Sequence, residues 1–308
     1  MRFIFLFGAV LLLCATGISQ ETNLAVTEAQ LKLLLDSTRT EKNDSTRLAL
    51  NREFYDKLYN AVMSDPQASY PFDSLYIGKP ASEDGKVRLF NWNIQQNNGQ
   101  NIYFLIIHHI DLNKVFRMAP IAALENVENN RLFTNMDWPG GLIYKVIYRN
   151  ESKKPFYTLL SWDGFSRSTL RKSVDILSFD NEGNPVFGLP VFKTRDGIQH
   201  RVVKEYSSEA RFTLIYDKQS IKISNVRKSK RKLTDYMIIL DKLIPLNESL
   251  VGEYWAYVPA GDTYDAYVFL NQYWTFVEDI APRNPSVPKT KAKKVEYDLF
   301  PAREPKTN

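Results

Sequence analysis

Residues 87–109 read VRLFNWNIQQNNGQNIYFLIIHH, and this stretch is the clearest indication of the fold class. Val87–Asn93 and Ile102–His109 are rich in β-branched and aromatic residues, which favour strands. Between them lies Asn98-Gly99, whose two residues both tolerate positive φ and signal a tight turn. The stretch therefore predicts an antiparallel β-hairpin.

The same pattern continues to Glu278, because short runs of valine, isoleucine, tyrosine and phenylalanine alternate with turn residues such as Asn271-Gln272. Short strands joined by tight turns pair antiparallel, and no helices alternate with them as in a doubly wound fold. We expect a mainly β (α+β) protein with one antiparallel β domain over residues 71–280. Further strands are predicted at Val115–Ile121, Leu142–Tyr148, Phe156–Trp162, Pro185–Phe192, His200–Tyr206, Arg211–Tyr216, Ser220–Val226, Tyr236–Leu240, Tyr254–Tyr257, Ala266–Leu270 and Tyr273–Glu278.

Residues 20–70 are predicted to form a helical segment that packs on this domain. Thr27 begins a capping-box pattern, and a stripe of leucines at helical spacing follows it. The polar stretch 38–45 separates this helix from a longer one over Thr46–Met63, which Asp65-Pro66 ends.

Two stretches of the β domain carry a different or ambiguous pattern. Leu124–Arg131 is predicted to be a short helix. In Arg167–Phe179 the apolar spacing fits a helix, whereas its second half, Val174–Phe179, reads equally well as a strand.

Residues 1–19 have the pattern of a secretory signal peptide. Arg2 supplies a positive charge, Phe3–Cys14 is apolar apart from a single glycine, and small residues precede the expected cleavage after Ser19. The apolar run is well short of the roughly 20 residues that span a bilayer, so we expect no transmembrane span in the mature chain. The protein is therefore predicted to be exported, to the periplasm or the extracellular space. The alternative is a lipoprotein anchored at Cys14, although the bulky Leu13 precedes that cysteine.

Loss of the signal peptide also removes the only cysteine of the chain. The mature protein would then have no disulfide, no thiol nucleophile and no thiolate ligand. We expect its fold to depend on the hydrophobic core alone, for which a chain of this length is sufficient.

The positive charge of the chain is concentrated at its C-terminal end. The 40 basic and 35 acidic residues give +5, and removal of Arg2 leaves +4. Residues 281–308 hold seven basic and three acidic residues, a net +4, so the remainder is formally neutral. We expect a disordered Pro/Lys-rich tail over 281–308 and no nucleic-acid partner, which would require a basic face as well. The basic run Arg227–Lys232 is interpreted as a solvated loop.

Tryptophans close to acidic residues are the best candidates for a ligand site, since aromatic faces stack on sugars and an exported protein can meet glycans. The candidate ligand-binding residues are Trp162, Asp163, Trp255 and Asp265. The competing interpretation is that the tryptophans fill sheet cores and that the acidic residues close turns. Glycosidases need two carboxylates, for which the candidates are Asp163, Asp262, Asp265, Glu278 and Asp279.

No sequence motif predicts a cofactor or a metal. The chain lacks the serine elbow, the zinc-binding helix, the phosphate loop and the dinucleotide fingerprint. His108 and His109 are neighbours on a predicted strand and point to opposite faces. One of them with His200 and Asp111 is the alternative metal site, but no ligand spacing supports it. We therefore expect no metal and no cofactor, and the sequence identifies no catalytic residue.

Three short motifs carry a family resemblance. YTLLSWDG at residues 157–164, PVFG at 185–188 and YDAY at 264–267 resemble an uncharacterised family of exported, β-rich bacterial envelope proteins. The similarity covers about residues 85–280. It implies a single β-rich domain and an envelope location, and it transfers no activity and no catalytic residue to this chain.

These patterns predict an exported, non-enzymatic envelope protein that binds an envelope protein, a glycan or another ligand through its β domain. The alternative is a carbohydrate-active hydrolase or glycan-binding module. Two carboxylates in a cleft lined by exposed tryptophans would favour that alternative, and buried tryptophans would leave the binding interpretation. A third hypothesis, a structural subunit of an envelope assembly, predicts a broad exposed apolar patch.

Overall fold

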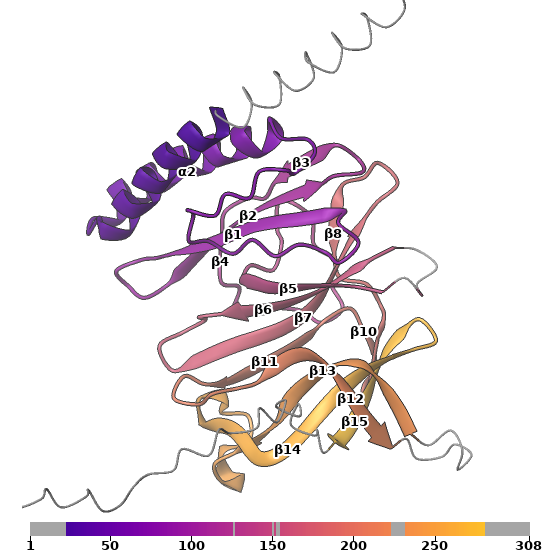
Figure 1. Ribbon diagram of the computed structural model, residues 1–308. Helices are drawn as coiled ribbons and strands as arrows, with labels where there is room; N and C mark the ends of the chain where they lie inside the picture. Colours follow the sequence, from indigo (N-terminus) through magenta and orange to yellow (C-terminus); the bar gives the residue numbers. More distant parts are fainter. Residues whose placement is uncertain (1–22, 126, 150, 152–154, 223–231, 281–308) are drawn as a thin grey trace, which may run out of the picture.

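Within the described residues, two N-terminal helices and three sheets are stacked in layers (Figure 1). The computed structural model describes residues 23–125, 127–149, 151, 155–222 and 232–280. The predicted mainly β fold, with helices packed on large antiparallel sheets, is confirmed. The predictions for the signal peptide, for Cys14, for the tail and for residues 227–231 of the basic run lie outside the described residues.

The first helix covers residues 23–40, and α2 covers Asp44–Met63. The capping prediction for Thr27 was wrong, because Thr27 lies inside the first helix and its hydroxyl donates to the Asn23 carbonyl. The helix continues to residue 40, into the polar stretch, where the Thr38 and Thr40 hydroxyls make the same backward bond to the preceding turn. Among the described residues, no helix combines the length and the hydrophobicity needed to cross a membrane.

The first sheet contains β1 (Val87–Gln95), β2 (Asn101–His109), β3 (Lys114–Arg117) and β4 (Ile121–Ala122). The predicted hairpin is confirmed, with Ile94 opposite Ile102. Its loop is longer than a two-residue turn: only Gly99 has positive φ, at +90°, and its N–H donates to the Gln96 carbonyl. The predicted strand 115–121 is split into β3 and β4, both of which pair with β2.

The second sheet has the order β11-β7-β6-β5, with β8 beside β7. The ambiguous stretch 167–179 forms the strand β7. The members of the second sheet are β5 (Leu142–Tyr148), β6 (Tyr157–Asp163), β7 (Thr169–Phe179), β8 (Pro185–Phe187) and β11 (Val202–Ser207).

The third sheet has the order β10-β9-β15-β14-β13-β12, and all its pairings are antiparallel except that of β15 with β9. Asn271 and Gln272 both have positive φ and form the predicted tight turn. The prediction of a strand over 254–257 was wrong, because a 3-10 turn, η3 (Tyr254–Ala256), occupies most of this stretch. The members are β9 (Phe192–Thr194), β10 (Gly197–Gln199), β12 (Leu214–Lys222), β13 (Lys232–Pro245), β14 (Tyr257–Leu270) and β15 (Tyr273–Ile280), with the 3-10 turn η2 (Glu248–Leu250) between β13 and η3.

A hydrophobic core separates each layer from the next. Phe54 and Leu58 of α2 pack on Trp92 and Phe104 of the first sheet. The opposite face of that sheet packs on the second sheet, and the second sheet packs on the third around Trp274. Both faces of the first and second sheets are therefore buried, each against a separate hydrophobic cluster.

The predicted helix over 124–131 was wrong, since the described part of this stretch contains no helical turn. Arg171 donates to the carbonyls of Leu124 and Glu125, and Arg201 donates to those of Glu128 and Arg131, at 2.6–2.8 Å. These four carbonyls therefore accept from the guanidinium groups of Arg171 in β7 and of Arg201, which directly precedes β11.

Candidate functional site

Trp162 and Asp163 form a structural corner between the first two sheets. The Tyr103 hydroxyl donates to Asp163 at 2.6 Å and accepts from the Gly164 N–H. The Trp162 indole lies so close to Gly164 that a Cβ there would approach it to 2.7 Å. Burial raises the pKa of the Asp163 carboxyl, which the hydrogen bond from Tyr103 opposes. The WDG motif therefore joins β6 to β2, and Asp163 ends the strand β6 instead of lying in the turn that the structural interpretation expects.

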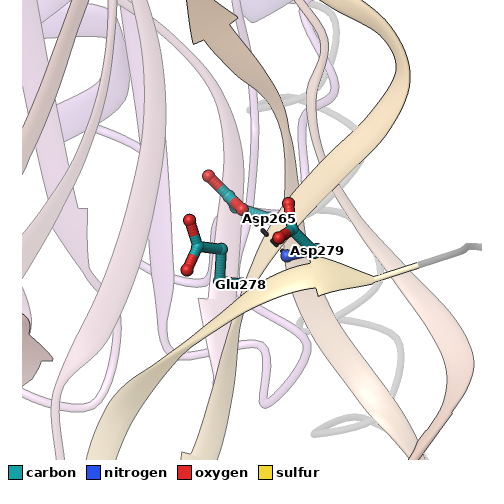
Figure 2. A group of neighbouring side chains, drawn as sticks. All are labelled: Asp265, Glu278 and Asp279. Atoms are coloured by element: carbon teal, nitrogen blue, oxygen red, sulfur yellow. Dashed lines mark hydrogen bonds between the residues drawn. The ribbon is translucent and has the colours of Figure 1, made fainter.

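Asp265 lies on β14 next to two carboxylates of β15, Glu278 and Asp279 (Figure 2). The Asp279 N–H donates to Asp265 at 3.2 Å, where the β14–β15 register shifts. Burial raises the pKa of the Asp265 carboxyl. One oxygen of each residue lies within 4.8 Å of the others, and within the described residues no other group of three or more potential metal ligands is this close.

Two cations of the protein already pair with two of these three carboxylates, Glu278 and Asp279. The Lys242 amine lies 3.2 Å from Glu278 and 2.8 Å from Asp279, and Arg195 also pairs with Glu278. The charge balance therefore supplies no argument for a bound metal ion. The alternative metal site, a histidine with Asp111, is not supported either, because the Asp111 carboxylate is already paired with the Lys86 amine at 2.7 Å.

Asp265 and Glu278 line a cavity of about 560 Å³ that we call the polar pocket. Tyr254, Tyr257 and Lys204 also line it, and burial lowers the pKa of the Lys204 amine. Trp162, Asp163 and Trp255 are not among its lining residues. The structure thus places one of the four predicted ligand residues in a pocket and does not bring the four together.

The tryptophans are mostly core residues. Trp92, Trp138 and Trp274 are buried, and Trp162 is half-buried. Trp255 is 48% exposed, on η3, and its indole donates to Glu253. The cleft lined by exposed tryptophans that would favour a glycosidase is therefore absent from the described part of the chain.

A larger cavity, of about 760 Å³, lies between α2 and the first sheet, and we call it the helix–sheet cavity. Its volume is within the range of about 300–1,000 Å³ typical of small-molecule sites. Figure 1 shows α2 above the strands whose side chains form the other wall. Apolar lining predominates, with Leu48, Ile102, Phe104, Pro120 and Ala122 among its members.

Asn51 of α2 is the polar group that distinguishes this cavity. Its side chain is buried, and its Oδ1 accepts from the Trp92 indole N–H at 2.7 Å. An indole nitrogen only donates, which assigns the oxygen end of the amide to Trp92. The Nδ2 end is buried without a hydrogen-bond partner among the described residues. A buried donor costs about 1–3 kcal/mol unless an acceptor, from a water molecule or a ligand, satisfies it.

Tyr55 and Arg117 form one wall of the cavity in fixed positions. The Tyr55 hydroxyl lies 2.7 Å from the carbonyl oxygens of both Leu105 and Met118, and burial raises its pKa. The Arg117 guanidinium stacks on the Tyr55 ring, 4.1 Å from its centroid, and pairs with Asp56. These contacts tie α2 to the sheet across the cavity and make the cavity a preformed feature.

Sequence reasoning missed the helix–sheet cavity. The available signal was Asn51 itself, a polar residue three positions after Leu48 and four before Tyr55, on the apolar stripe of α2. A polar residue on such a stripe must find a partner in the core or in a ligand.

No family model, curated protein or solved structure matches this chain. The resemblance to exported envelope proteins therefore stays a prediction.

Proposed function

We propose that this protein is an exported, non-enzymatic binding protein of the cell envelope, and that its ligand occupies the helix–sheet cavity. The observation that carries the proposal is a preformed, mainly apolar cavity of about 760 Å³ with the unpartnered amide nitrogen of buried Asn51 in its wall. Apolar pockets with a few placed polar groups are the usual form of small-molecule sites. The site lies between the helical segment and the β domain, so both parts of the protein contribute to binding.

The absence of a catalytic arrangement in this cavity supports binding over catalysis. Its charged lining consists of Arg52, Asp56 and Arg117, and the last two are paired with each other. Among the described residues, no histidine and no second carboxylate lines it to serve as a general acid or base.

The test is occupancy of the cavity by a neutral apolar fluorophore such as N-phenyl-1-naphthylamine. Wild-type protein should bind it saturably with one site. Ala122→Trp should fill the cavity and weaken binding at least tenfold, because Ala122 lines the cavity beside Ile102, its neighbour on the paired strand β2. Ala81→Trp is the matched control, since Ala81 is an exposed alanine bridged to β1 that does not line the cavity. Equal binding by Ala122→Trp and wild type would refute the proposed site.

A glycan-binding or hydrolytic role of the polar pocket is the second candidate. One observation favours it: Asp265 and Glu278 line one pocket with oxygens within 4.8 Å, close to the roughly 5–5.5 Å of retaining glycosidases. The raised pKa of Asp265 suits a general acid. Hydrolysis of an oligosaccharide panel by wild type but not by Asp265→Asn would establish this role, and inactivity of the wild type would eliminate the hydrolase.

A further inference from the structure

We propose that the helix–sheet cavity selects an amphipathic organic anion: an apolar chain lies in the cavity, and an anionic head group accepts hydrogen bonds from Asn51 and Arg52. This inference rests on the proposed function and adds the chemical class of the ligand. Three features of the cavity carry it, namely its apolar wall, its buried donor and its unbalanced charge.

The side chains of β2 and β4 in the cavity wall favour an apolar ligand body, and Gln96 and Gln100 of the loop between β1 and β2 add polar groups to the lining. Ile102 and Phe104 alternate along β2 toward the cavity, and Ala122 of β4 stands directly opposite Ile102. These side chains offer no hydrogen-bonding group. A sugar or a peptide placed against them would lose its hydrogen bonds to water without replacement, whereas a hydrocarbon chain gains from the contact.

The buried polar group of the cavity demands an acceptor. With its oxygen held by Trp92, Asn51 presents only the Nδ2 donor for a ligand. A carboxylate, carbonyl or hydroxyl oxygen satisfies this donor, and an ammonium group cannot. Asn51 therefore selects a head group that can accept a hydrogen bond, whatever the charge of that group.

The charge of the cavity selects an anion from among the acceptors. Asp56 and Arg117 neutralise each other, which leaves Arg52 as the uncompensated charge of the lining. Arg52 is exposed, and among the described residues its guanidinium has no ion-pair or hydrogen-bond partner. It follows Asn51 directly on α2, so the buried donor and the exposed cation lie on the same turn of the helix. One head group with two or more oxygens is suited to reach both.

The experiment compares three probes with the same twelve-carbon chain: dodecanoate, 1-dodecanol and dodecylammonium, each below its aggregation concentration. Displacement of N-phenyl-1-naphthylamine from the full-length protein at pH 7.5 measures their affinities. We expect dodecanoate to bind at least tenfold more tightly than dodecylammonium and more tightly than the alcohol. Only dodecanoate should weaken with added salt, because Arg52 is exposed to screening.

Two variants assign the selectivity to the proposed residues. Arg52→Gln should reduce dodecanoate affinity to the level of the alcohol, and Lys57→Gln should not. Lys57 is the matched control because it carries the same charge on the same helix and is not a lining residue of the cavity. Asn51→Asp keeps an oxygen for Trp92 and removes the donor, so it should weaken dodecanoate at least tenfold while its circular dichroism stays native.

The outcomes separate this inference from the proposed function. Equal affinity of all three probes, lost in Ala122→Trp, would refute the anion selectivity and leave the binding site in place. Failure of the wild type to bind any probe would overturn the proposed function itself. Loss of dodecanoate selectivity in Lys57→Gln as well as in Arg52→Gln would show a general charge effect and refute the assigned role of Arg52.

Discussion

Arg201→Met is the most informative perturbation of the fold, because it removes one guanidinium that connects three segments. Arg201 is fully buried, directly beside Asp175 of the neighbouring strand β7, and donates to that carboxylate at 3.0 Å. It also donates to the carbonyls of Glu128 and Arg131 at 2.6 Å. Methionine keeps a flexible apolar stem of similar length but supplies no donor.

The expected loss follows from breaking a buried ion pair on one side. Removing one partner typically costs about 3–5 kcal/mol, because the other charge stays buried without compensation. The released carbonyls of the 124–131 stretch add to that loss unless water reaches them. For a domain of this size, the change corresponds to a decrease in melting temperature of roughly 10 °C.

The assays are urea denaturation for the free energy of unfolding and amide hydrogen exchange for the local effect. We expect faster exchange over residues 127–131, because Arg201 holds this stretch in its non-helical conformation. Lys32→Gln is the control: its pair with Asp36 is exposed on both sides, and its loss should cost under about 0.5 kcal/mol. A loss below about 1 kcal/mol in Arg201→Met, with unchanged exchange, would refute this reasoning.

Three further predictions concern the same network and the cavity wall. Burial raises the pKa of Asp175 to about 6, so the folded state binds more protons than the unfolded state between about pH 4 and 6. The contribution of Asp175 to stability should thus fall as pH rises through that window, and Asp175→Asn should abolish this part of the pH dependence measured by denaturation. Gly188→Ala should lower the melting temperature by more than Gly85→Ala does. Both glycines have positive φ, but only at Gly188 would a Cβ meet Arg201, at 2.6 Å. Equal decreases in melting temperature would contradict this contact. Tyr55→Phe should cost about 1–2 kcal/mol in urea denaturation, because two buried carbonyls lose their shared donor, and a neutral result would indicate that water replaces it.

Local sequence patterns predicted much of the secondary structure correctly. The hairpin of β1 and β2, the tight turn at Asn271-Gln272 and the end of α2 before Pro66 all depend on residues close together in sequence. Alternation of apolar residues and the backbone preferences of asparagine, glycine and proline act over a few positions, so a single sequence contains them. The helical boundaries were less accurate, since the first helix begins before Thr27 and continues to residue 40 within the polar stretch.

The candidate site was largely beyond sequence reasoning. Of the four predicted ligand residues, Asp265 lines a pocket, whereas Asp163 is bonded to Tyr103, 60 residues away. The sequence showed tryptophan beside aspartate, but the role of that pair depends on a partner from another sheet. Asn51 carries a functional signal only because Trp92, 41 residues further on, takes its oxygen and leaves its nitrogen unpaired.

By itself, the sequence determined the class of the fold: helices at the N-terminus, then short strands that pair mainly with their neighbours. Only the tertiary structure decided the path of residues 124–131 and the location of the helix–sheet cavity. The physical reason is that local helix preferences are small compared with the free energy at stake in a buried ion pair. Apart from proline, intrinsic helix preferences differ by under about 1 kcal/mol per residue. Removing one partner of a buried ion pair costs about 3–5 kcal/mol, and Arg201 pairs with Asp175 while it also donates to two carbonyls of this stretch.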